Sequence, residues 1–130
     1  VDGVSEITEI EAHIARYTGE KRADVIVVDY LQIISYDGSD SREGQISEIA
    51  RRLKVSALKN NSIMLTASQL NDEGRLRESR AIGMHSDQVV YVEHFKTKSM
   101  LTIKKNRRGA RNYTTEIIMR GDISKLEEVY

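Results

Sequence analysis

The run Val25–Val28 is the feature that most limits how this chain can fold. Four apolar β-branched residues stand together with no polar residue between them, and Asp29 follows directly. A strand with one face in water would alternate apolar and polar residues, so this run predicts a strand covered on both faces, as in a parallel sheet. A helical pattern separates it from a second apolar run, Ile63–Ala67. The two strands are therefore expected to be parallel neighbours joined by a right-handed crossover.

Helices and further strands are expected around this pair. One apolar stripe predicts a helix of about four turns near the N-terminus, and a second predicts a helix that ends near Asn60. The stripes are Val4, Ile7, Ile10, Ile14 and Tyr17, and then Ile46, Ile49, Ala50, Leu53 and Ala57. The polar segment Asn71–Ser86 is expected to be a long loop or a loop with one helical turn. Extended pieces are predicted at 87–93, 100–106 and 113–119, the last two as an antiparallel hairpin at a sheet edge.

The chain length and composition indicate one α/β domain. At 130 residues the chain has the size of a single domain, and residues 1–130 are expected to fold as one. No apolar run reaches the ~20 residues that span a bilayer. There is no cysteine for a disulfide or a Cys-based zinc site, and no signal peptide opens the chain, so a cytoplasmic setting is expected. Because residue 1 is Val rather than Met, the chain is expected to be a fragment or a processed product.

A basic segment is hidden by the net charge of zero. Residues 96–111 hold seven Lys and Arg residues and no Asp or Glu. Such a segment indicates a phosphate-bearing partner, although a solvated hairpin would have the same composition. The chain has six Tyr, one Phe and no Trp. This scarcity argues against an aromatic surface that stacks bases and favours contacts to a nucleic-acid backbone.

Polar side chains follow both predicted parallel strands, where open α/β sheets bind their ligands. Asp29 follows the first strand, and Ser68 and Gln69 follow the second. A carboxylate in this position can hold Mg²⁺, usually through waters, and an amide one strand over can reach a phosphate oxygen or an attacking water. A strand-terminal Asp can equally be a helix cap or a loop anchor. A third interpretation, Asp29 as a phosphate acceptor, lacks the acidic cluster and lysine that it needs.

Several segments together resemble one known family. They are "DVIVVDYLQII", "SREGQISEIARRLKVSALKNNSIMLTASQLN", "LRESRAI" through "SDQVVYVE", and "LTIKKNRRG". Their order and spacing are similar to those of the C-terminal motor domain of DnaB-like replicative helicases, over about residues 7–119. The resemblance implies part of a RecA-like sheet with crossover helices, ATP and Mg²⁺ as cofactors, and a homo-hexamer that translocates on single-stranded DNA and unwinds duplex. A primase and a helicase loader are further partners that it implies.

The resemblance also implies roles for residues of the nucleotide site. "VIVVD" is similar to the Walker B strand, so Asp29 would organise Mg²⁺ on ATP, with Ser68 also contacting the cofactor. Gln69, in "ASQLN", matches a sensor of the γ-phosphate. Lys105 and Arg107, in "KKNRRG", match an arginine finger and its lysine, which reach the γ-phosphate of the neighbouring subunit. Because these two cations are two residues apart on an extended segment, they are expected to point together at one phosphate.

A DNA-binding loop is implied by "LRES". Arg77 and Glu78 match its contacts to the DNA backbone, one to phosphate and one for positioning. Arg80 stands where the family commonly has a glycine. It would either add a charged contact to DNA or block the older one.

Two family features are missing from this sequence. No Gly-x-x-x-x-Gly-Lys-[Ser/Thr] loop is present, and the family's phosphate loop and catalytic glutamate lie upstream of the matched region. The chain is therefore expected to be the C-terminal part of a longer helicase or a degenerate relative, and inactive towards ATP by itself. The alternative is a non-catalytic RecA-like module that binds single-stranded DNA or a helicase subunit.

Overall fold

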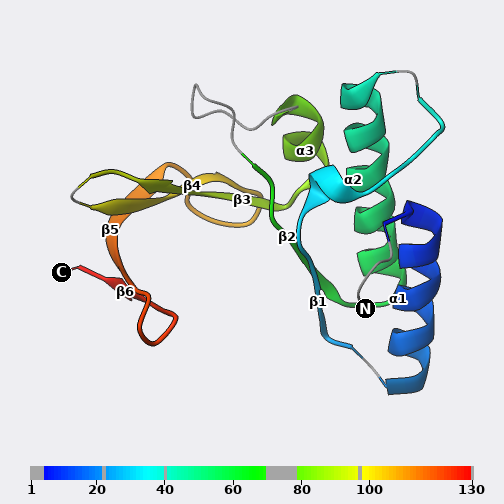
Figure 1. Cartoon of the computed structure of the whole chain (residues 1–130), viewed down its shortest axis with the longest axis horizontal. Helices are drawn as coiled ribbons and strands as arrows, with labels where there is room; N and C mark the ends of the chain where they lie inside the picture. The colour runs from blue at the N-terminus through cyan, green and yellow to red at the C-terminus, as the bar shows by residue number, and fades with distance from the viewer. Residues whose placement is uncertain (1–4, 22, 40, 70–78, 97, 130) are drawn as a thin grey trace. The chain divides into compact units, whose positions relative to one another are not determined.

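The protein divides into two compact units, each with its own sheet. The computed structural model describes residues 5–21, 23–39, 41–69, 79–96 and 98–129. The units are Val1–His85 and Ser86–Tyr130. The first contains a two-stranded sheet and the second a four-stranded sheet (Figure 1). The expectation of one domain stays a prediction.

The first unit contains the predicted pair of parallel strands. Its elements are α1 (Ile7–Lys21), β1 (Val25–Val28), the 3₁₀ helix η1 (Leu31–Ile33), α2 (Arg42–Lys59), β2 (Ile63–Thr66) and α3 (Ser79–His85). β1 pairs with β2 in parallel, with Val25 opposite Ile63 and Val28 opposite Thr66. Since α2 connects them, the predicted strand–helix–strand order is confirmed.

Both long helices pack on the same face of this sheet (Figure 1). The core contains the fully buried side chains Ile7, Leu31, Ile34, Ile46, Ile49 and Leu53. α2 begins where Ser41 accepts a hydrogen bond from the backbone N–H of Gly44 at 3.1 Å, because a side-chain oxygen there satisfies a free N–H of the first turn. Both predicted apolar stripes are confirmed in outline. Tyr17, however, is 45% exposed, and Val4 lies outside the described residues.

The expectation that β1 is covered on both faces is wrong for the described residues. Ile26, Val28 and Met64 pack against the core. The opposite face of the sheet carries four apolar side chains that are 54–66% exposed, namely Val25, Val27, Ile63 and Leu65. The reason is that α1 and α2 both lie on the same side of the strands.

The segment Asn71–Ser86 is more helical than predicted. α3 occupies Ser79–His85, and Ile82, on this helix, is buried in the core of the first unit. Ala81 and Ile82 are both buried, and their burial stabilises this short helix although the sequence before it is polar. Residues 70–78 lie outside the described part of the chain.

The second unit is an antiparallel sheet in the order β3–β4–β5–β6. Its strands are β3 (Gln88–His94), β4 (Ser99–Asn106), β5 (Tyr113–Arg120) and β6 (Lys125–Glu128). The three predicted extended pieces and the β4–β5 hairpin are confirmed. The predicted place of the hairpin at a sheet edge is wrong, because β3 pairs with β4 and β6 pairs with β5, so the hairpin lies in the middle of the sheet. The sequence did not predict β6, because "KLEE" has only one apolar residue and its pairing with β5 alone makes it a strand.

Replacing a core isoleucine should test this division between buried and exposed faces. Ile49→Ala should lower the free energy of unfolding by about 2–5 kcal/mol, since it leaves a cavity in a site with no solvent access. Ile63→Ala removes the same atoms from a side chain that is 66% exposed, and should cost less than half as much. Urea denaturation measures both. Equal losses would mean that the exposed sheet face is buried in solution.

Candidate functional site

The carboxyl ends of β1 and β2 lie side by side. Beyond the last strand pair, the backbone N–H of Ala67 donates to the carbonyl of Val28 at 3.3 Å, and the N–H of Leu31 donates to the carbonyl of Ala67 at 3.1 Å. Asp29 is the first residue after β1. It lies between Val28 and Leu31, whose backbone groups make these two hydrogen bonds, and it is exposed. The neighbouring strand ends that the sequence predicted are therefore brought together, which puts a carboxylate beside the segment that leads to Ser68 and Gln69.

Gln32 is a polar residue of this region that the sequence did not single out. Its Nε2 donates to Ser68 Oγ at 2.8 Å, so the 3₁₀ helix after β1 is joined to the segment after β2. Gln32 Oε1 is buried and has no hydrogen-bond partner among the described residues. Gln69 itself is exposed. The only sequence signal for Gln32 is one amide inside the apolar run that follows Asp29.

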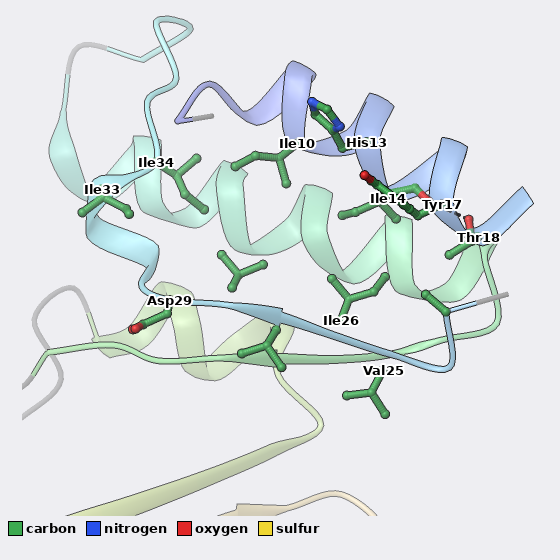
Figure 2. Close-up of a pocket in the computed structure, with 13 residues that line it drawn as sticks. Ile10, His13, Ile14, Tyr17, Thr18, Val25, Ile26, Asp29, Ile33 and Ile34 are labelled. Carbon is green, nitrogen blue, oxygen red and sulfur yellow. Dashed lines mark hydrogen bonds between the residues drawn. The ribbon is translucent and has the colours of Figure 1, made fainter. Parts of the chain in front are cut away.

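A hollow runs between α1 and β1, and Asp29 lies at one end of it (Figure 2). His13 and Tyr17 of α1 stack with ring centroids 6.4 Å apart on its wall. Most other wall residues are aliphatic, including Ile10, Ile14, Val25 and Ile33. The described residues contain no group of three His, Asp or Glu side chains that could hold a metal ion. Asp29 contributes a carboxylate to the residues that line this hollow.

Lys105 and Arg107 both contact the segment that precedes β3. Lys105 Nζ donates to the carbonyl of Ser86 at 2.7 Å, and Arg107 Nη1 lies 3.1 Å from Asp87 Oδ1. The backbone N–H of Arg107 also donates to the carbonyl of Asp87 at 2.9 Å. The Arg107 side chain is 54% exposed, so its guanidinium remains open to solvent. Arg108 and Arg111 are exposed in the turn that follows β4.

The predicted DNA loop is described only in part. Arg77 and Glu78 lie outside the described residues. Arg80 is exposed in the first turn of α3, where a cation is accessible to an anionic partner. The assignment of these three residues to DNA contact stays a prediction.

The arrangement in the first unit is that of α/β proteins that bind ligands beyond the carboxyl ends of parallel strands. A family model, the DnaB-like helicase C-terminal domain, matches residues 2–128. The chain therefore belongs to that family.

Individual relatives are consistent with this membership. A "probable plasmid replicative DNA helicase" of Chlamydia trachomatis is 30% identical over 70% of this chain, and the corresponding protein of Chlamydia muridarum is 29% identical over the same share. A solved structure of a DnaB-like replicative helicase, described with its interactions with primase, matches 88% of the chain with a TM-score of 0.74 and 21% identity. That structure supports the fold.

The matched proteins are much longer than this chain. It spans 23% of the length of the curated relatives and 33% of the solved helicase chain. Among the described residues, no helix is both long and apolar enough to cross a membrane.

A double-mutant cycle on Gln32 and Ser68 should detect the link between the two strand ends. Gln32→Ala and Ser68→Ala each remove the 2.8 Å hydrogen bond, so their effects on the free energy of unfolding should couple by about 0.5–1.5 kcal/mol. Ser62→Ala, on the same chain but without this contact, serves as the control partner for Gln32→Ala and should show no coupling. Additive losses for Gln32 and Ser68 would contradict the link.

Proposed function

We propose that this chain contributes the C-terminal part of the motor domain of an ATP-dependent replicative DNA helicase, and that both units belong to that one domain. The observation that carries the proposal is the family match, which runs over residues 2–128 and so includes every predicted site residue. The neighbouring ends of β1 and β2 support it, because they place Asp29 next to the segment that carries Ser68 and Gln69. The proposed location is the cytoplasm.

Asp29, Ser68 and Gln69 form the proposed nucleotide side of the site. ATP bound with Mg²⁺ would supply the phosphoanhydride bond whose hydrolysis drives movement. Asp29 would hold the ion through waters, since Mg²⁺ usually keeps several of its waters. Gln69 would orient the attacking water or sense the γ-phosphate with its amide. Ser68 is held by Gln32, which limits how far this segment can shift.

Lys105 and Arg107 form the proposed trans side of the site in a homo-hexamer. Arg107 is half exposed and carries a charge that another subunit can reach. A cation placed on the γ-phosphate of a neighbour neutralises charge that develops during transfer, and is most effective when it is already in position. Six copies in a ring would give each ATP one such partner.

The helicase is proposed to translocate on single-stranded DNA, which it contacts through Arg77, Glu78 and Arg80. The exposed position of Arg80 on the short helix α3 supports a phosphate contact there. Primase and a helicase loader are proposed as further partners. The matched helicase structure is described with its interactions with primase, and this supports the first of these partners.

A non-catalytic role is the second candidate. It is favoured by the absence of a Gly-x-x-x-x-Gly-Lys-[Ser/Thr] loop from the sequence. In that case the chain would bind single-stranded DNA or a helicase subunit without hydrolysing ATP. Turnover by the full-length protein separates the two candidates.

Removing either member of the cation pair should abolish turnover while leaving nucleotide binding intact. In the full-length protein, Arg107→Ala and Lys105→Ala should lower kcat for ATP by about 10³-fold or more, as for other trans-acting arginines. Binding of a fluorescent ATP analogue should change little, because these residues act on the neighbour's phosphate. Arg120→Ala is the matched control, since Arg120 is an exposed arginine of the same sheet paired with Asp122. Normal turnover in Arg107→Ala would refute the finger assignment.

The salt dependence of DNA binding should reveal a phosphate contact at Arg80. For oligo(dT), the slope of log K against log salt concentration should become less steep by about 0.7 in Arg80→Ala, the value for one phosphate contact on a single strand. Arg120→Ala should leave the slope unchanged. Equal slopes for Arg80→Ala and the unaltered protein would exclude that contact.

A further inference from the structure

We propose that Asp87 is a positioning residue for Arg107. This proposal rests on the proposed function, because Arg107 matters for turnover only if it acts as the trans finger. Neither the helical pattern nor the charge run of the sequence pointed to Asp87. The assignment comes from the pairing of the start of β3 with the end of β4, which puts Asp87 beside Arg107.

Asp87 holds Arg107 at two points. Its carboxylate oxygen Oδ1 lies 3.1 Å from Arg107 Nη1, and its carbonyl oxygen accepts the backbone N–H of Arg107 at 2.9 Å. A long arginine side chain loses much rotamer freedom when it is fixed. With both its backbone and its guanidinium anchored, Arg107 has lost part of that freedom before any phosphate arrives, and binding then costs less.

The contact leaves Arg107 able to bind a second acceptor. A guanidinium has five N–H donors in a planar fork, and the Asp87 contact is made through Nη1. The two side chains are about half exposed, at 54% for Arg107 and 48% for Asp87. Asp87 can therefore orient the group without enclosing it.

Lys105 is anchored by the residue next to Asp87. Its Nζ donates to the carbonyl of Ser86 at 2.7 Å. β3 and β4 are antiparallel, with Gln88 opposite Asn106, so the two residues before β3 lie beside the end of β4. Ser86 offers a neutral carbonyl from the backbone, whereas Asp87 offers a charged side chain. Asp87 is thus the anchor whose contribution can be removed by substitution without changing the main chain.

An exposed ion pair of this kind adds little to the stability of the fold. Pairs between half-exposed side chains typically stabilise a protein weakly, because solvent screens them and ordering the side chains has an entropic cost. Loss of the Asp87 carboxylate should therefore appear in turnover rather than in unfolding. This separates a positioning role from a structural one.

The test is Asp87→Asn in the full-length protein, with ATP turnover and DNA unwinding as readouts. The substitution keeps the size of the side chain and the backbone hydrogen bond but removes the charge. We expect kcat to fall about 10- to 100-fold, as when a catalytic group is displaced by about 1 Å. KM for ATP should stay within about twofold, because Arg107 serves the neighbour's phosphate during transfer rather than the binding of nucleotide. The thermal unfolding midpoint should not change.

Two matched variants accompany it. Asp122→Asn removes the carboxylate of another exposed ion pair of the same sheet, Asp122 with Arg120 at 3.3 Å, and should leave kcat unchanged. Asp87→Glu keeps the charge on a longer side chain and should recover part of the lost turnover. Failure of Asp87→Glu to exceed Asp87→Asn would contradict a role that depends on the charge.

Mixed rings give a readout that a structural role would not move. Asp29→Asn subunits lack the ion-site carboxylate but keep an intact Arg107, whereas Asp87→Asn subunits have the opposite defect. In a mixed ring, some Asp87→Asn subunits bind ATP next to an Asp29→Asn subunit. At such a site the first subunit supplies Asp29 and the second supplies Arg107 positioned by Asp87, so every required group is present. Mixing the two proteins should therefore raise turnover above that of either alone.

The outcomes distinguish this inference from the proposed function. If Arg107→Ala keeps normal turnover, the proposed function fails and the positioning role fails with it. If Arg107→Ala loses turnover but Asp87→Asn keeps kcat within twofold, the positioning role is overturned and the proposed function stands. A loss in Asp87→Asn that mixing does not relieve also overturns it, since Asp87 would then act within its own subunit.

Discussion

The parallel pairing of β1 with β2 is the interaction on which the candidate nucleotide site depends. Four paired positions run from Val25 with Ile63 to Val28 with Thr66, and the bonds at Ala67 extend the pairing past the strand ends. α1 and α2 press on one face through fully buried isoleucines and leucines. Because backbone hydrogen bonds set the register and packing sets the face, Asp29 and Ser68 leave neighbouring strands at one edge. Neither the hydrogen bonds nor the packing alone would bring these two polar residues together.

The second unit differs from the first, because it holds the cations Lys105 and Arg107 at one end of a sheet that has no large core. Its strands are held mainly by antiparallel hydrogen bonds, and several of its apolar side chains, such as Val92 and Met119, are exposed. At the basic end, polar contacts join the residues before β3 to the end of β4 and the residue after it. Such contacts add little stability, but they can fix the direction of a side chain. A proposed finger needs that fixed direction more than it needs burial.

Periodicity predicted most of the secondary structure, and it failed where a partner element decides the outcome. The stripe through Ile46, Ile49 and Leu53 predicts α2 because helix geometry alone places these residues on one face. β6 has no comparable pattern and forms by pairing with β5. The expected burial of both faces of β1 was wrong for the described residues, since an unbroken apolar run shows that a strand suits burial but not which neighbours are present.

Sequence by itself determined the family, the order of the elements before β6 and the candidates Asp29, Ser68, Gln69, Lys105 and Arg107, because these follow from local residue type and spacing. Only the tertiary structure decided that Gln32 joins Ser68, and that Ser86 and Asp87 anchor the two cations. Those partners are 19 or more residues apart along the chain, and the pairing of strands brings them together. Register depends on the pairing and packing of whole elements, which no single stretch of sequence encodes.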